Sequence, residues 1–214
     1  MSKGLLIIIS GPSGSGKSTI RNHLLEMSDE FYYSVSATTR PIKDNEIDGV
    51  DYHFITHDEF NQRIENDDFL EYKPYSVNMY GTIKSKVTEQ LEAGKNVILD
   101  IEVKGALELM DKYPDIISIW LLPPNYTALR NRLYDRKRDT PEEIERRLDI
   151  AKEEIKHFYT YDYIVVNDDG QPDKAAREIM NIIECEKLKT SRNQKFYENF
   201  NKQNQGEYYD LSPN

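Results

Sequence analysis

A segment rich in glycine and serine matches the phosphate-loop pattern G-x-x-x-x-G-K-[ST] at every fixed position. In such a loop, glycines let backbone N–H groups converge on phosphate oxygens, and the N-terminus of the next helix favours their negative charge. The lysine reaches the β- and γ-phosphates of a nucleoside triphosphate, and the following hydroxyl ligates Mg²⁺. The segment therefore predicts an ATP-type site and leaves open what happens to the nucleotide. Its residues are Gly11, Pro12, Ser13, Gly14, Ser15, Gly16, Lys17, Ser18 and Thr19.

The elements that must hold this loop follow an α/β pattern. Apolar, β-branched runs occur at residues 5–9, 96–101, 116–122 and 163–166, and such runs are typical of strands buried on both faces of a parallel sheet. Helical patterns separate them, at residues 17–27, 84–92, 105–112, 126–138, 141–157 and 173–188. Strands alternating with helices predict an α/β fold with a parallel sheet, here of the phosphate-loop type.

Two segments interrupt this alternation. Residues 34–82 are rich in tyrosine, aspartate and short alternating runs, and they predict a small, mostly β insert. Residues 126–158 are strongly charged and predict a helical, arginine-rich lid. The core domain then comprises residues 1–33, 83–125 and 159–188. The polar tail, residues 189–214, is rich in asparagine and glutamine and predicts a frayed helix end followed by disorder.

The composition excludes several classes of protein. The 214 residues contain 28 Lys and Arg against 38 Asp and Glu, a net charge of −10, which argues against a nucleic-acid or anionic-membrane partner. The single cysteine, Cys185, excludes an intrachain disulfide and a Cys-rich zinc site. The longest apolar run, residues 4–9, is too short to span a bilayer. We expect a cytoplasmic protein, and a homodimer is compatible with these features.

The phosphate loop occurs in several enzyme classes. A Ras-type GTPase needs a base-reading N-K-x-D element, and the sequence contains none. A motor or helicase would be longer than this chain. A small nucleotide kinase needs a second anion site for its acceptor monophosphate and an arginine-rich lid, and the two inserts carry residues suited to both tasks.

Several further motifs resemble those of guanylate kinases, in the family's order. After the phosphate loop come S-V-S-x-T-T-R at 34–40, G-V-D-Y at 49–52, F-L-E at 69–71 and Y-G-T at 80–82. A G-A turn at 105–106, L-L-P-P at 121–124 and V-V-N-D-D at 165–169 follow. The resemblance extends from about Gly4 to Leu188, nearly the whole chain before the tail.

The resemblance implies GMP as the acceptor. In that family a serine, two arginines and two tyrosines hold the GMP phosphate, and these positions fall on Ser36, Arg40, Lys43, Tyr52 and Tyr80. A glutamate and a hydroxyl residue read the guanine, and they fall on Glu71 and Thr82. Guanine presents N1–H and N2–H₂ as paired donors, which a carboxylate accepts together. Adenine would leave Glu71 unpaired, and unpaired buried polar groups produce strong discrimination.

The resemblance also implies a set of catalytic residues. Asp100, at the end of a core strand, is expected to act through Mg²⁺ or its waters, and Glu102 is expected to face the guanine end. Asn167 occupies the adenine side of the ATP site. No general base is expected, because transfer between phosphates needs alignment and charge neutralisation more than proton abstraction. The catalytic set implied is Lys17, Arg40, Asp100, Arg132, Arg136 and Arg147, with Ser18 and Asp100 as the metal-binding residues.

Departures from the family pattern keep alternatives open. Lys43 stands where the family has an arginine, the run 73–79 (KPYSVNM) is rewritten, and the lid lacks the family's glycines. One alternative is a kinase of the same fold with another acceptor, such as dGMP, a modified guanylate or a phosphorylated sugar. The other is a non-catalytic guanylate-kinase-like binding module. Such modules typically lose the phosphate-loop lysine, whereas Lys17 is present here.

The lysine at position 43 generates a first prediction. It keeps the charge of the family's arginine but loses bidentate geometry toward a phosphate. We therefore expect Lys43→Arg to tighten GMP binding. Steady-state kinetics with GMP as the varied substrate would measure the effect, and an unchanged or raised Michaelis constant would contradict it.

Overall fold

The computed structural model of the chain describes residues 3–135 and 140–207. The chain divides into two compact units, Met1–Ala176 and Arg177–Asn214. The first unit carries every predicted site residue, because the last of them is Asn167.

A five-stranded parallel sheet forms the core of the first unit, with strand order β2-β7-β1-β8-β9. The strands are β1 (Leu6–Ser10), β2 (Phe31–Tyr33), β7 (Asn96–Asp100), β8 (Ile117–Leu122) and β9 (Tyr163–Val166). The predicted α/β fold with a parallel sheet is thus confirmed, and so are the four predicted core strands. The fifth strand, β2, was not predicted, because its three residues include two half-buried tyrosines and form no apolar run.

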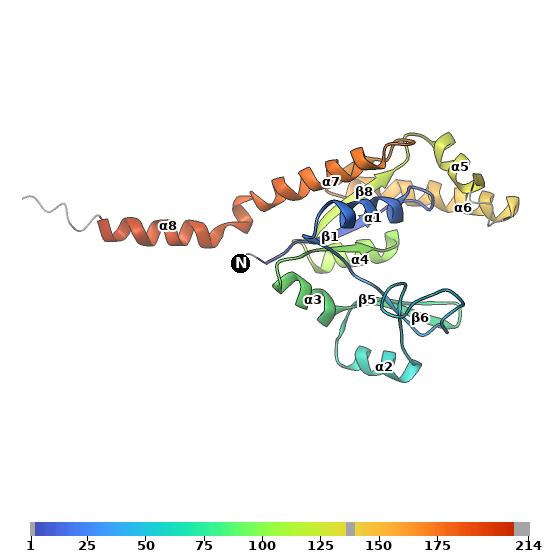
Figure 1. The fold of residues 1–214 in the computed structure, drawn as a ribbon, viewed down its shortest axis with the longest axis horizontal. Helices are drawn as coiled ribbons and strands as arrows, with labels where there is room; N and C mark the ends of the chain where they lie inside the picture. The colour runs from blue at the N-terminus through green and yellow to red at the C-terminus, as the bar shows by residue number, and fades with distance from the viewer. Residues whose placement is uncertain (1–2, 136–139, 208–214) are drawn as a thin grey trace, which may run out of the picture. The chain divides into compact units, whose positions relative to one another are not determined.

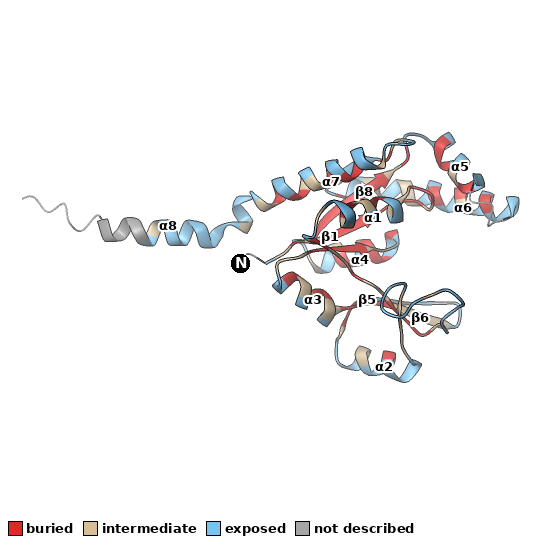
Figure 2. Cartoon of the chain, in the orientation of Figure 1, coloured by how far each residue is buried: buried red, intermediate tan, exposed pale blue. Residues whose placement is uncertain are grey.

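Helices flank this sheet, as the alternation predicts (Figure 1). The helices that contact its strands include α1 (Lys17–Met27), α3 (Lys84–Glu92) and α4 (Val103–Lys112). Helices α5 (Tyr126–Asp135) and α6 (Pro141–Glu154) follow β8 along the chain, and α7 (Pro172–Lys187) follows β9. The predicted helix over 141–157 ends earlier, at Glu154, and continues as a 3₁₀ helix, Ile155–Thr160. Along α4, α5 and α6, buried positions recur among exposed ones (Figure 2), as expected for helices that cover a core with one face.

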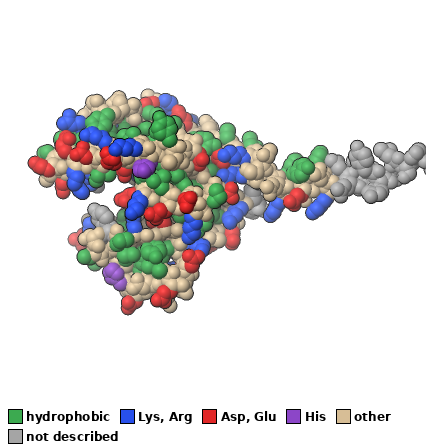
Figure 3. Space-filling view, turned by 180° about the vertical axis from the view of Figure 1, so that it is seen from behind, with side chains coloured by type: hydrophobic (Ala, Val, Ile, Leu, Met, Phe, Trp, Pro, Cys, Tyr) green, Lys and Arg blue, Asp and Glu red, His purple; other side chains and the backbone are tan. Residues whose placement is uncertain are grey.

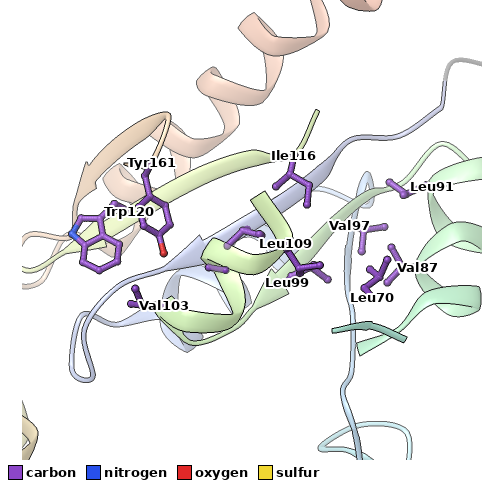
Figure 4. Packing of buried hydrophobic residues seen from close by; sticks show 12 residues of the cluster. Leu70, Val87, Leu91, Val97, Leu99, Val103, Leu109, Ile116, Trp120 and Tyr161 are labelled. Atoms are coloured by element: carbon purple, nitrogen blue, oxygen red, sulfur yellow. The ribbon is translucent and has the colours of Figure 1, made fainter. Parts of the chain in front are cut away.

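Alternating side chains of the core strands pack against α3 and α4 on one face of the sheet. Ile8, Leu99 and Trp120 are almost fully buried there, in one cluster with Val87 of α3 and Leu109 of α4. Figure 4 shows this packing, with Tyr161 beside Trp120, and their ring centroids lie 4.7 Å apart. Burial on both faces explains why these strands are continuous apolar runs.

Residues 34–82 contain a second sheet of four strands, in the order β4-β3-β6-β5. Its strands are β3 (Ala37–Thr38), β4 (His53–Phe54), β5 (Phe69–Tyr75) and β6 (Asn78–Ile83). The segment also contains a helix, α2 (His57–Glu65), which was not predicted. A capping box between Thr56 and Glu59 starts this helix, and that spacing is a sequence signal that could have revealed it. Phe60 of α2 packs on Phe69 and Ile83, so the segment has its own small core.

Helices α5 and α6 share a separate apolar cluster made of Leu129, Leu133, Ile144, Leu148 and Ala151. A capping box between Thr140 and Glu143, with Pro141 as the first helical residue, starts α6. The last residues of the predicted helix over 126–138 lie outside the described part of the chain.

The sequence predicts a frayed helix end followed by disorder after residue 188, and the structure has helical elements at residues 190–207. They form a 3₁₀ turn, Thr190–Arg192, and the helix α8 (Gln194–Glu207). The buried Glu186 pairs with Lys189 and Arg192 at 2.6 and 3.1 Å, and the Asn193 amide donates to the carbonyls of Lys187 and Lys189. The carbonyl of Lys187, the last residue of α7, thus has a hydrogen-bond partner, and α8 begins directly after Asn193. Composition alone does not reveal these bonds. Within residues 3–135 and 140–207, no helix has the length and apolarity to cross a membrane.

Candidate active site

The phosphate loop joins the end of β1 to the start of α1 in a turn that only glycine can make at two positions. Gly11 has φ +148°, and a Cβ there would lie 2.2 Å from the carbonyl oxygen of Leu121. Gly16 has φ +96°, and a Cβ there would lie 2.3 Å from the amide nitrogen of Asn167. These angles belong to the region that side chains other than glycine rarely adopt. The turn therefore aims the N-terminus of α1 into the loop, as an anion site requires.

The side chains of the loop are disposed for phosphate and metal. Lys17 bends back over the loop, and its Nζ donates to the carbonyl of Gly11 at 2.7 Å. Ser18 and Thr19 are exposed in the first turn of α1. Ser15 is buried, and its hydroxyl finds no hydrogen-bond partner within the described residues. A hydroxyl donor is thus held ready inside the loop.

Asp100 lies next to this loop because β7 pairs with β1. The register places Asp100 opposite Ile9, near the end of β1. Burial raises the pKa of Asp100, while the nearby cations Lys17 and Arg21 favour its carboxylate form. The guanidinium carbon of Arg21 lies over the ring of Tyr33, 4.1 Å from the ring centroid. Arg21 was not singled out from the sequence, since nothing in its local spacing marks it.

A cavity of about 280 Å³ opens between the second sheet and the end of β7. Most of the residues predicted to bind GMP line it together with Asp100. The lining consists of Ser36, Tyr52, Glu71, Lys73, Tyr80, Gly81, Asp100, Ile101 and Glu102. The structure thereby brings the predicted acceptor residues close to the phosphate loop. Lys73, in the rewritten run, is a lining residue that sequence reasoning did not assign.

Glu71 is half-buried in this cavity and is held by a neighbour across the hairpin. Thr82, opposite it on β6, donates its hydroxyl hydrogen to Glu71 Oε1 at 2.7 Å. Burial raises the pKa of Glu71, whereas the bond from Thr82 and the charge of Lys73 lower it. The bond from Thr82 therefore orients one oxygen of the Glu71 carboxylate, Oε1. The other oxygen, Oε2, lies near Gly105, where a Cβ would be 3.6 Å away from it.

Arg40 and Lys43 lie in a loop beside the cavity and are absent from its lining. The Arg40 guanidinium forms a two-point pair with Glu46, with N···O distances of 2.9 and 2.8 Å. Glu46 also accepts the backbone N–H of Lys43 at 2.9 Å, and these bonds lower its pKa. The Arg40 guanidinium lies 5.4 Å from the ring of Tyr52. Glu46 therefore orders this loop, whereas the Lys43 side chain is exposed.

The arginines of α5 and α6 reach the phosphate loop. Arg132 donates to the carbonyls of Ser15 and Asn167 at 3.2 and 2.7 Å and pairs with Asp169 at 2.6 Å. The amide of the buried Asn167 also donates to the Ser15 carbonyl, at 2.9 Å. Arg147 donates to the Ser13 hydroxyl at 3.4 Å.

A second cavity, of about 480 Å³, includes Gly16, Thr19, Arg132 and Asn167 in its lining. Its lining shares no residue with that of the first cavity, which suits separate sites for a donor nucleoside and an acceptor. The predicted residue Arg136 lies outside the described part of the chain.

Comparison with known proteins identifies the family. The guanylate kinase family model matches residues 3–186. The chain belongs to the guanylate kinase family. It is 46% identical over 190 residues to the guanylate kinase of Clostridium perfringens, covering 89% of this chain and 87% of that protein. Against the guanylate kinase of Lactococcus lactis the identity is 47% over 190 residues, covering 89% and 92%.

A solved relative agrees with this membership of the guanylate kinase family. The crystal structure of guanylate kinase from Anaplasma phagocytophilum superposes with a TM-score of 0.69 at 31% identity, covering 89% of this chain and 90% of that chain. The match to the family model ends at residue 186. Helix α8 therefore lies beyond the segment that defines the family.

The close approach of Gly16 to the Asn167 side chain generates a prediction. We expect Gly16→Ala to weaken ATP·Mg²⁺ binding by at least about tenfold, equivalent to about 1.4 kcal/mol, because the new methyl group would displace Asn167. Isothermal titration calorimetry would measure the loss. Gly49→Ala is the matched control, since Gly49 also has positive φ, +77°, lies outside the phosphate loop, and has no atom closer than 3.7 Å to the position of a Cβ. An equal loss of affinity in both variants would contradict the prediction.

Proposed function

We propose that the chain transfers the γ-phosphoryl group of ATP to GMP, giving ADP and GDP. The observation that carries this proposal is the position of Glu71. It is half-buried, bonded to Thr82, and lines the same cavity as Asp100, which neighbours an intact phosphate loop. A fixed carboxylate oxygen beside a free one suits the paired N1–H and N2–H₂ donors of guanine.

The donor side of the proposal rests on the phosphate loop. Backbone N–H groups of the segment from Gly11 to Thr19 cradle the ATP phosphates, Lys17 binds the β- and γ-phosphates, and Asn167 lies toward the adenine. Ser18 and Asp100 offer the hard oxygen donors that Mg²⁺ prefers, the second directly or through water. When bound, Mg²⁺ neutralises charge on the phosphates being separated.

On the acceptor side, Ser36, Tyr52 and Tyr80 offer hydroxyl groups to the GMP phosphate from the cavity wall. Arg40 adds a guanidinium that Glu46 already holds in place. Lys43 reaches the same phosphate from the exposed loop. Charge-assisted bonds of this kind are the strongest available to a dianionic phosphate. Glu102 contributes to the lining at the guanine end.

The transfer step is proposed to need alignment and charge neutralisation, without a general base. Lys17 belongs to the phosphate loop, and Arg132 and Arg147 bond to Ser15 and Ser13 of the loop. Positive charge there stabilises the transferring phosphoryl group. Arg136 is proposed to join them. A lid that closes over the donor excludes water that would otherwise hydrolyse ATP.

We propose the division of labour among segments that the sequence implies. Residues 1–33, 83–125 and 159–188 act as the ATP-binding core, 34–82 as the GMP-binding insert and 126–158 as the lid. The separate apolar clusters of the insert and of α5 with α6 support this division, because each segment has a small core of its own.

Three observations support small molecules as the partners and a cytoplasmic location. On the face that Figure 3 shows, acidic and basic side chains are interspersed, unlike the continuous basic surface of a nucleic-acid binder. The net charge is −10 and the one cysteine is unpaired, which suits a reducing compartment.

An acceptor panel tests the proposal. We expect rapid ADP formation from ATP·Mg²⁺ with GMP, slower turnover with dGMP and IMP, and almost none with AMP, CMP, UMP or without acceptor. Adenine would leave Glu71 unpaired, a mismatch that separates related substrates by about 10⁴-fold or more. A Lys17→Ala variant controls for contaminating kinases. Turnover of another acceptor in place of GMP would overturn the choice of substrate.

Replacing the guanine reader should separate activity from stability. We expect Glu71→Gln to lower kcat/KM for GMP by about 10²- to 10³-fold, because an amide cannot accept both guanine donors. Glu108→Gln, which removes an exposed carboxylate of α4 near Glu71, is the matched control. Comparable losses in the two variants would count against Glu71 as the reader.

We also expect Glu71→Gln to raise the thermal midpoint of the ligand-free chain at pH 7. Burial raises the pKa of Glu71, so its contribution to stability is full below the ordinary glutamate pKa and falls as pH rises through the raised value. Glu71→Gln removes the titrating carboxyl group, so this variant does not lose that stability as the pH rises. Its advantage should therefore appear at pH 7 and vanish near pH 4, as thermal scans at both values would measure. A lower midpoint at pH 7 would contradict this.

A further inference from the structure

Lys73 belongs to the run 73–79, which departs from the family pattern. It lines the 280 Å³ cavity that we assign to the acceptor, called the acceptor cavity below. It lies two residues after Glu71 on β5, so both side chains project from the same face of the strand. Their partners across the hairpin are Thr82 for Glu71 and Tyr80 for Lys73. The face that carries the guanine reader therefore carries a cation beside it, and both residues line the cavity.

The Lys73 side chain crosses the cavity to the opposite wall. Its Nζ lies 2.5 Å from Oε2 of Glu102, which follows β7 in the core. The ion pair joins residues 29 positions apart in sequence. It thus ties the β5–β6 hairpin of the insert to the core sheet at the place where the acceptor must bind. Glu71, by contrast, is held by Thr82 within the hairpin itself.

The charges in the cavity give this pair a consequence for the acceptor. Its lining includes three carboxylates, Glu71, Asp100 and Glu102, and among the described residues Lys73 is the one cation in it. A nucleoside monophosphate brings a dianion into this space, and unscreened like charges repel it. Lys73 offsets the charge of Glu102, whose side chain is 72% exposed and lines the same cavity.

We propose that Lys73 determines acceptor affinity by neutralising Glu102 and holding the insert against the core. The proposal rests on the proposed function, and it makes Lys73 the partner that holds Glu102 in the cavity. Lys73 is thus a positioning residue. It binds no reacting atom.

Two variants test the proposal in the full chain. We expect Lys73→Met to raise both KM and Kd for GMP about three- to tenfold, with kcat and KM for ATP within about twofold of wild type. Lys73→Arg should keep the pair and stay within about twofold for GMP.

The chain offers a closely matched control. Lys84 pairs with Asp67 at 2.6 Å, and the exposed fractions of the two side chains are 37% and 75%, against 34% and 72% for Lys73 and Glu102. Lys84 lines a different groove, outside the acceptor cavity. Lys84→Met should therefore leave the KM for GMP unchanged, while it removes a comparable surface ion pair.

The outcomes separate this inference from the proposed function. A wild-type chain that neither turns over nor binds GMP overturns the proposed function, and the inference with it. An active wild type whose KM for GMP is the same in Lys73→Met overturns the inference alone.

Discussion

The tight turn between β1 and α1 is the constraint on which the rest of the site depends. A side chain at Gly11 or Gly16 would collide with Leu121 or Asn167, so the loop is pressed against the ends of β8 and β9. That close approach lets the Asn167 amide and Arg132 reach the carbonyl of Ser15. The glycines therefore do more than leave room for phosphate. They also allow the strands and the α5–α6 hairpin to meet at one point.

The acceptor cavity shows how the fold tolerates negative charge where a negatively charged ligand must bind. Glu71 and Asp100 are half-buried, and burial raises the pKa of both. The Thr82 hydroxyl stabilises the carboxylate form of Glu71 by a hydrogen bond. The positive charges of Lys17 and Arg21 stabilise the carboxylate form of Asp100. This arrangement costs stability and provides selectivity, because a fixed carboxylate is satisfied only by a ligand with the right donors. The second sheet and the core sheet each contribute one wall of it.

Much of the fold follows from local patterns. The strands β1, β7, β8 and β9 are recognisable because burial on both faces demands continuous apolar residues. Strand β2 and helix α2 escape this reasoning for different reasons. Phe31–Tyr33 is short and half-polar, and pairing with β7 makes it a strand. Helix α2 is polar apart from Phe60 and Ile64, although its capping box marks the start. Helix α8 follows a turn in which the buried Glu186 pairs with Lys189 and Arg192, and composition does not reveal that pairing.

The sequence by itself determined the phosphate loop, the parallel α/β core and the family resemblance, because these depend on residue types at short, fixed spacings. Only the tertiary structure decided which distant residues meet. It brought Glu71 and Asp100 to one cavity, paired Lys73 with Glu102 across it, and set Arg132 against the Ser15 carbonyl. The physical reason is that such contacts depend on how two sheets and a helical hairpin pack, and no local pattern along the chain encodes the distance between them.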